Sequence, residues 1–348
     1  HGLLDTGRVM VVTTGDTIPM VRFDGVNDKL QATDGTLGQS DGKSFIWSCW
    51  VLKFEDDASS EMSMFGNTSN RFVVKFGLTH KVVVLLRDSA GGTVGSVLST
   101  NSVLVADGLT HIAVCIDLAN ATQADRIKIF INGVKETLVN STAPTDTTVD
   151  FTTGSVAIGK ATNDTAQGDM ELGQYYFAEE LFDLDTAENL AKVYSSGAVD
   201  MGADASNVTG TQPLIYLNNT LSTWQNNLGS GGNFTETGAL TAGTDIVSSL
   251  PSGLDSETAY YVVNKTANDL ELSLTSGGAT VAVTDNGTGT HSILAVTQAT
   301  LTDQGDFDTG KATLSGTVDI SGQPSDTDMT LIVQTKNTKD TKLHGQAL

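Results

Sequence analysis

Apolar and polar residues alternate along two neighbouring stretches in the first half of the chain. Isoleucine, valine and leucine occupy every second position of residues 112–118, and three isoleucines do the same in residues 126–131. A period of two is typical of a strand with one face against a core. Asn132-Gly133 follows and supplies the two positive-φ positions of a tight hairpin turn. The pattern predicts two antiparallel strands of a β-sandwich, with Ile129 facing inward.

Residues 44–54 are apolar at almost every position. Because successive strand side chains point to opposite faces, both faces of this strand are apolar. One face carries Phe45, Trp47, Cys49 and Val51, and the other carries Ile46, Trp50, Leu52 and Phe54. This leaves two alternatives, a central strand buried on each side or a strand whose second face binds a ligand.

One short helix is expected near the middle of the chain. Asp185 suits its N-cap, with Glu188 three residues later, and Gly197 suits the position after its last turn. Elsewhere, 36 glycines and five prolines describe turns and strands. The composition therefore predicts an all-β protein.

HIAVCIDLAN at 111–120, followed by RIKIFINGVKE at 126–136, resembles the laminin-G-like, concanavalin A-like jelly roll. Members of that family carry a His-hydrophobic-Ala-Val strand and then a Phe/Tyr-hydrophobic-Asn-Gly hairpin. Residues 21–32, 44–56 and 167–197 resemble, in the same order, its opening strand, its central aromatic strand and its closing strand with a short helix. The resemblance spans residues 16–240 and implies this sandwich. It implies no single function, because the fold hosts lectins, adhesins, enzymes and inert spacers.

Residues 250–292 resemble a small β-module that recurs in virion proteins of tailed bacteriophages. The resemblance is carried by Tyr-Tyr-Val-Val, Leu-Ser-Leu-Thr-x-Gly-Gly and Gly-Thr-Gly-Thr-His at similar offsets. Residues 310–348, with strands expected at 312–320 and 329–335, are similar to the C-terminal strands of phage fibre and decoration proteins. These resemblances imply a virion surface, extracellular location.

The expected fold class is all-β, a concanavalin A-like jelly-roll sandwich with one short helix plus small C-terminal β-modules. Its expected parts are an N-terminal arm or linker at 1–14 with a strand-like stretch at 9–13, the sandwich at 15–240, a small β-module at 241–297 and a C-terminal module at 298–348. Both small modules are short of large apolar residues. Modules of this size are marginally stable alone. We expect the C-terminal region to serve attachment or oligomerisation, with other virion proteins or as a homo-oligomer, most simply a trimer.

Charge and cysteine content narrow the partners further. A formal net charge of -22 argues against nucleic acid and anionic membrane surfaces. No apolar run is long enough to insert across a membrane. Cys49 and Cys115 fall inside expected strands, where reduced core thiols are favoured over a disulfide. Neither a Cys-x-x-Cys pair nor a Cys/His cluster suggests zinc.

Candidate catalytic groups are few. Some enzymes of this fold cleave β-glucans with a Glu-x-Asp-x-x-Glu strand motif, and the sequence lacks it. Glu179, Glu180, Asp183 and Asp185 gather where a strand meets the helix, and capping with the helix dipole explains them better than catalysis. His111 opens a core strand and is expected to be a structural hydrogen-bonding residue. We therefore expect a protein that is not an enzyme.

The turn DGVND offers a candidate metal site. Asp24, Asn27 and Asp28 carry oxygens of the kind that Ca²⁺ binds, and some laminin-G-like domains bind calcium at a rim. The spacing differs from that of an EF-hand loop. Asp and Asn are also the ordinary residues of such a turn. No cofactor is required by the sequence, and calcium is the one candidate.

Glycan binding calls for exposed aromatic rings. Trp47 and one of the adjacent Tyr175 and Tyr176 are expected in the core, since neighbouring strand side chains point oppositely. Trp224 lies in a loop rich in Asn and Gly and is the candidate ligand-binding ring.

The function expected is that of a non-enzymatic structural protein outside a phage particle, as a head decoration protein, fibre or tail appendage. Its lectin-like sandwich would face host-surface polysaccharide. Two alternatives stay open, a glycan-degrading virion depolymerase on the same fold and a bacterial surface adhesin.

Overall fold

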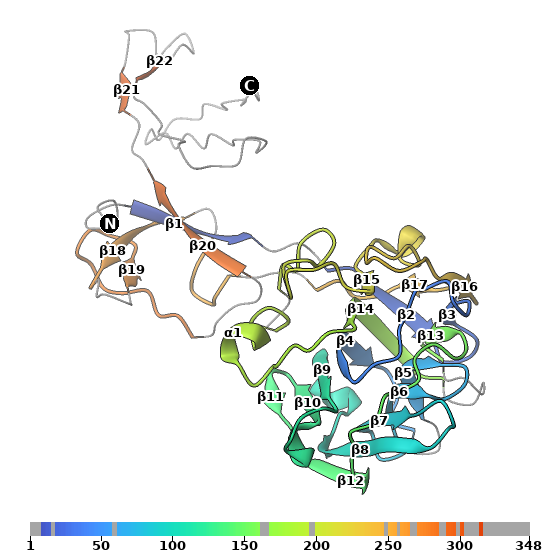
Figure 1. Cartoon of the computed structure of the whole chain (residues 1–348). Coiled ribbons are helices and arrows are strands. Elements are labelled where there is room, and N and C mark those ends of the chain that lie inside the picture. The colour runs from blue at the N-terminus through green and yellow to red at the C-terminus, as the bar shows by residue number, and fades with distance from the viewer. Residues whose placement is uncertain are drawn as a thin grey trace.

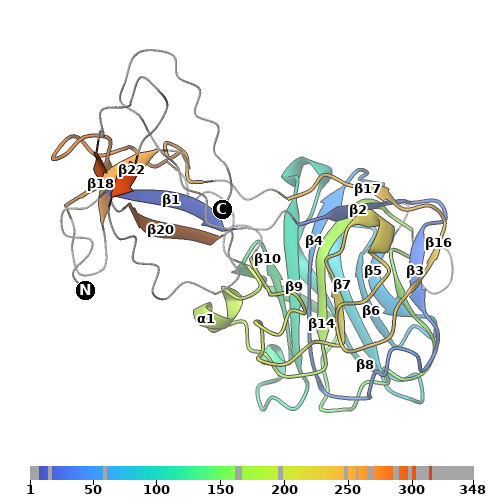
Figure 2. The same ribbon diagram turned by 90° about the horizontal axis from the view of Figure 1, so that it is seen from above.

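The computed structural model describes residues 8–14, 18–57, 61–160, 167–194, 199–246, 250–255, 258–264, 270–284, 290–296, 300–302 and 313–315. Two eight-stranded sheets stack face to face as a β-sandwich, and a separate four-stranded sheet forms a second, smaller unit (Figures 1 and 2). Every strand pair in the three sheets is antiparallel. The predicted all-β, concanavalin A-like jelly-roll class is confirmed.

The first sheet contains the two strands with which the sequence pattern began. Its order is β11 (Val134–Lys135), β10 (Ile127–Ile131), β9 (Thr110–Asp117), β4 (Ser44–Lys53), β14 (Asp169–Ala178), β2 (Met20–Asp24) and β17 (Thr241–Ala242), with β15 (Ile215–Leu217) also paired to β14.

The second sheet supplies the other wall of the sandwich. Its order is β12 (Leu138–Thr142), β8 (Thr93–Ser102), β7 (Lys81–Arg87), β6 (Phe72–Phe76), β5 (Met62–Asn67), β13 (Val156–Ile158), β3 (Lys29–Ala32) and β16 (Thr235–Thr237). Short 3₁₀ turns lie at Val105–Asp107, Gln123–Asp125 and Leu221–Thr223.

The space between the two sheets holds one large aromatic and aliphatic core. Phe45, Trp47, Cys49 and Val51 of β4 all enter it, as the alternation predicted. Phe151 and Phe177 stack there with ring centroids 4.9 Å apart. Ile129 is fully buried in this core, and its Cα partner across the sheet is Val114.

The outer face of the first sheet is buried as well. Ile46 of β4 joins a second cluster there with Phe130, Tyr176 and Phe182, and this cluster lies under the chain between β14 and β15. Trp50 joins a third cluster with Ile18, Met20 and Ile246. Of the two alternatives for this strand, the structure has the first, a central strand buried on each side.

The two cysteines are free and buried, as predicted. Cys49 faces the core between the sheets, whereas Cys115 faces the outer cluster. A disulfide would need both thiols on one side of the first sheet. Burial also raises the pKa of the Cys115 thiol to about 11, which keeps it protonated.

Among the residues that the structure describes there is one α-helix, α1, which spans Ala187–Leu190 and has Thr186 as its N-cap. The prediction of Asp185 as N-cap is wrong by one residue, because the Asp185 carboxylate pairs with Lys128 and Lys135. The predicted C-terminal position, Gly197, lies outside the described residues.

The small sheet is built from both ends of the chain. Its order is β19 (Glu271–Ser273), β18 (Ala259–Val263), β1 (Arg8–Thr14) and β20 (Thr290–Val296), and Figure 1 shows the blue β1 among the orange strands. The segment expected as an arm or linker is therefore a strand between two others, because its alternating valines suit a half-buried position. A further pair, β21 (Thr300–Thr302) and β22 (Thr313–Ser315), follows; the remainder of the predicted C-terminal module lies outside the described residues.

The sandwich continues beyond the predicted boundary at residue 240. β17 pairs with β2, and the backbones of Ile18 and Ile246 exchange two hydrogen bonds of 2.9 Å each. The two ends of the sandwich thus meet side by side. The strands of the small sheet come from the chain before Ile18, which supplies β1, and after Ile246, which supplies β18, β19 and β20.

We expect Ile129→Ala to lower the free energy of unfolding by roughly 2 to 5 kcal/mol, because the change removes buried carbons and leaves a cavity. Denaturant unfolding measures it. Val139→Ala, at a side chain that is 50 % exposed, is the control. A loss under about 0.5 kcal/mol at Ile129 would contradict its inward position.

The independence of the sandwich stays a prediction, now with a sharper boundary. We expect a fragment of residues 15–246 to unfold cooperatively, and to be more stable than a fragment of residues 15–240 by about 1 to 3 kcal/mol. The shorter fragment lacks β17 and the buried side chain of Ile246. Thermal and denaturant unfolding of the two fragments measure this. Equal stability, or failure of the longer fragment to fold, would contradict the division.

Candidate functional site

The predicted ligand-binding ring, Trp224, lies in the core. Its side chain is 0 % exposed, and its ring meets Phe23 edge to face with centroids 6.1 Å apart. The interpretation as a surface ring is therefore wrong. The polar side chains of this loop bind nearby backbone groups: the Asn227 side chain donates a hydrogen bond to the Leu214 carbonyl and accepts one from the Tyr216 N–H. The Trp224 ring turns inward and joins the core between the sheets.

Both adjacent tyrosines are buried, although one was expected to face outward. Tyr175 enters the core between the sheets, and Tyr176 enters the cluster on the outer face. They do point to opposite sides. Because the first sheet is covered on each side, neither ring reaches a ligand.

The turn that carried the calcium prediction uses its oxygens for its own backbone. Asp24 Oδ1 accepts the N–H groups of Val26 and Asn27, and hydrogen bonds from these N–H groups lower the pKa of that carboxyl. Asp28 is 3 % exposed, and its oxygens accept the N–H groups of Asp24 and Ala239. Calcium takes six to eight oxygens. Asp24, Asn27 and Asp28 therefore fit a turn better than a calcium site.

Each carboxylate of the acidic group at the start of the helix is bound to a serine, threonine or lysine partner. Glu179 accepts the Ser40 N–H, and Glu180 accepts the hydroxyls of Thr209 and Thr211. Burial raises the pKa of the Glu179 carboxyl. The group is structural, as expected, but it ties together separate segments of chain instead of capping the helix.

Lys128 is the centre of an ion-pair network on the outer face of the first sheet. It is 7 % exposed, and its Nζ lies 2.8 Å from Asp183 and 2.7 Å from Asp185. The hydrogen bond from Lys128 holds the pKa of the Asp183 carboxyl below its ordinary value. Burial would raise the pKa of Asp185, but hydrogen bonds from Lys128 and Lys135 outweigh it, and this pKa is also lowered.

A serine and a histidine meet inside the molecule. Ser48 Oγ lies 3.2 Å from His111 Nε2, and both residues are almost fully buried. Burial lowers the pKa of His111 to about 3, so the imidazole is neutral at ordinary pH. Its other nitrogen has no hydrogen-bond partner, hence no carboxylate orients it as in a catalytic triad. The structural interpretation of His111 agrees with this geometry.

Three aromatic rings of the described residues are not buried, namely Phe54, Tyr194 and Tyr261. The guanidinium of Arg22 covers Phe54 at 4.1 Å from the ring centroid. Tyr194 stacks on His111 with centroids 5.2 Å apart. Tyr261 lines a hollow on the small sheet.

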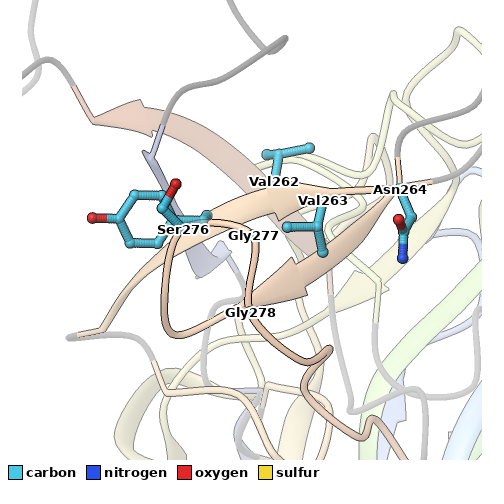
Figure 3. A pocket seen from close by; sticks show the side chains of 7 residues that line it. Val262, Val263, Asn264, Ser276, Gly277 and Gly278 are labelled. Carbon is cyan, nitrogen blue, oxygen red and sulfur yellow. The ribbon is translucent and has the colours of Figure 1, made fainter.

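This hollow, of about 360 Å³, lies on the small sheet, lined by Tyr261, Val262, Val263, Asn264, Ser276, Gly277 and Gly278. Figure 3 shows the Ser276–Gly278 turn bending beside the strand, with Asn264 at the strand's end. Asn264 Nδ2 donates to Glu271 Oε2 at 2.6 Å. A ring, an amide, a hydroxyl and glycine backbone around a hollow are groups that bind small polar ligands.

This hollow was not predicted from the sequence. Its walls nevertheless come from two of the stretches on which the resemblance to the phage module rests, Tyr-Tyr-Val-Val and Leu-Ser-Leu-Thr-x-Gly-Gly. Tyr261 of the first lies opposite Ser273 of the second across β18 and β19. These two motif stretches were the signal in the sequence from which the hollow could have been predicted.

Within the described ranges, no group of three or more His, Cys, Asp or Glu residues is arranged to hold a metal ion. No helix in that part of the chain has the length and apolar character needed to span a membrane.

No protein-family profile and no curated protein sequence matches the chain. Solved structures with a similar sandwich include a native heptameric SAP-like pentraxin from Limulus polyphemus, at 12 % identity and a TM-score of 0.38 over 68 % of this chain and 94 % of that one. The receptor binding domain of botulinum neurotoxin mosaic serotype C/D matches at 10 % identity and 0.37, over 53 % of this chain and 46 % of that one. The binding domain of Paraclostridial Mosquitocidal Protein 1 matches at 14 % and 0.35, over 52 % and 45 %. The chain thus spans less than half the length of these two toxin chains, and a likeness of this size concerns the fold alone.

The ion-pair network predicts a pH dependence. Because the folded pKa values of Asp183 and Asp185 are lowered, their contribution is fully present above the ordinary carboxyl pKa and is lost as the pH falls through the lowered values. We expect the free energy of unfolding to fall as the pH drops below about 4 and passes through these lowered pKa values. Lys128→Met should flatten this fall and cost roughly 1 kcal/mol at neutral pH, since both acids are partly exposed.

Lys135→Met is the matched control, because this lysine contacts Asp185 from a more exposed position. Its effect should be smaller. Identical pH profiles for the wild type and Lys128→Met would contradict the role of the network.

Proposed function

We propose that the protein is a non-enzymatic structural protein on the exterior of a bacteriophage virion, as a head decoration protein, fibre or tail appendage. It presents a lectin-like sandwich and contacts surface glycans. Its partners are other virion proteins and copies of itself, most simply around a threefold axis.

The phage assignment is supported by the resemblance of residues 250–292 to a recurrent virion module. The Tyr-Tyr-Val-Val stretch lies in β18, and the Leu-Ser-Leu-Thr-x-Gly-Gly stretch forms the end of β19 and the turn that follows it. β18 and β19 are paired. Agreement between a local sequence pattern and the structure around it is what a folding unit requires.

The observation that carries the glycan contact is the hollow beside Tyr261. A sugar ring stacks on an aromatic face, and its hydroxyls bond to amides, hydroxyls and backbone groups. The hollow brings Tyr261, Asn264 and Ser276 together. In the sandwich, the two partly exposed rings of the described residues line no such hollow: Arg22 covers Phe54, and Tyr194 stacks on His111.

The hydrogen bonds and ion pairs of the acidic residues support a protein without a catalytic role. Glu179, Glu180, Asp183 and Asp185 are each bound to a serine, threonine or lysine partner. Glycoside hydrolysis needs two carboxylates facing one groove, one of them free to transfer a proton.

The net charge narrows the class of glycan. At -22 the chain repels a polyanion, so acidic polysaccharide is disfavoured and neutral sugars are favoured.

Titration of the whole protein with neutral host polysaccharide and its oligosaccharides tests this function. We expect saturable binding that weakens about tenfold in Tyr261→Ala, a loss of about 1.4 kcal/mol. Leu274→Ala, 63 % exposed and outside the hollow, is the control and should bind as the wild type does.

Two outcomes would overturn the proposal. New reducing ends after incubation with polysaccharide would make the protein a depolymerase. Failure of antibodies against the sandwich to label intact particles would exclude the virion exterior.

A further inference from the structure

The small sheet contains one strand, β1, that is far in the sequence from the other three. β1 lies between β18 and β20, so these two strands contact each other only through it. Seven Cα pairs join β1 to β20, and three join it to β18. Both edges of β1 therefore carry ladder hydrogen bonds.

β1 also supplies much of the core of the small sheet. Four residues of that core are buried, and two of them, Val9 and Val11, come from β1; the other two are Tyr260 and Leu272. Val9 is 0 % exposed and Val11 is 4 % exposed. Without β1, the partly buried leucines and valines that surround this core lose their central contacts.

The chain attaches β1 to the sandwich and not to its sheet partners. Residues 15–17 join it to Ile18, which is bound to Ile246 by two backbone hydrogen bonds. The whole sandwich thus lies between β1 and β18 in the sequence, and the hydrogen bonds between Ile18 and Ile246 join its two ends. The contacts that hold β1 in its sheet are all non-covalent.

We propose that the space between β18 and β20 is a strand-binding slot that accepts Arg8–Thr14 in trans, from a second copy of this chain, as well as in cis. Contacts made by strand addition are the same whichever chain supplies the strand. Only the effective concentration of the tethered strand favours its own slot. Exchange of an identical element is a low-cost route to an oligomer.

The charge of the strand fits this role. Two copies of a chain with net charge -22 repel each other, whereas the strand RVMVVTT has one charge, the positive Arg8. The positive Arg8 is therefore the one charge that the inserted strand itself places in an acidic neighbouring copy. The proposal is independent of glycan binding and of the virion assignment.

Mixing two single-cysteine variants of the full chain tests exchange between copies. Val11 and Ile293 are direct Cα partners in antiparallel strands, a spacing that suits a disulfide. We expect Val11→Cys and Ile293→Cys, mixed at high concentration and then oxidised, to give a cross-linked heterodimer. The wild type, whose two cysteines are buried, and each variant oxidised alone are the controls.

A peptide of residues 8–14 tests the slot itself. In the full chain carrying Val9→Asp and Val11→Asp, hydrogen exchange at β18 and β20 should speed up at least tenfold, while the sandwich amides keep their protection. The wild-type peptide should restore protection and bind saturably, and a peptide with both aspartates should not. Rescue or the heterodimer supports the slot; no heterodimer together with no rescue overturns it.

Discussion

Burial of the first sheet on both faces is the constraint from which most of the molecule follows. β4 sends Phe45 and Trp47 into the core between the sheets and Ile46 and Trp50 into the clusters outside. A sheet covered on both faces needs apolar side chains at successive positions instead of alternate ones. The aromatic residues are consumed in meeting this need. The sandwich consequently keeps few rings for a ligand, and a partly exposed ring beside a hollow occurs on the small sheet.

Burial of the first sheet on both faces also explains what its neighbouring polar residues bind. The chain that covers the outer face must be fastened there, and burying polar groups is costly unless they are paired. Lys128 fastens it through Asp183 and Asp185, and Glu180 through Thr209. The Cys115 thiol donates to the Phe182 carbonyl at 2.9 Å. An acidic group that resembles a helix cap or an active site in the sequence is, in the folded chain, the attachment of a cover to a sheet.

The parts of the fold that follow from local alternation were predictable. The inward face of β10, the two apolar faces of β4 and the two reduced cysteines all depend on which side of a strand a residue takes, whereas the sequence left open whether the second face of β4 is buried or binds a ligand. β5 was not predicted, because every one of its residues is buried and a register shift between Ser63 and Phe65 breaks the period of two.

The errors share a different cause, which is contact between residues distant in sequence. Trp224 is buried because its ring packs against Phe23, which lies about 200 residues earlier in the chain. Asp185 fails to cap α1 because lysines of β10 and β11 bind it. β1 resembled an arm because its partners lie at the other end of the chain. Pattern alone reports the face of a strand, not its neighbour.

Pairing strands from opposite ends of a chain is costly in entropy, and the sandwich reduces that cost. An unfolded loop of about 250 residues between β1 and β18 costs roughly 2 kcal/mol more to close than one of about 20, since each doubling adds about 0.6 kcal/mol. Once the sandwich has folded, the bridge between Ile18 and Ile246 brings its ends together. The effective loop is then only the residues on either side of that bridge. A folded sandwich therefore acts as a short connection, and the small sheet gains its central strand at little further entropic cost.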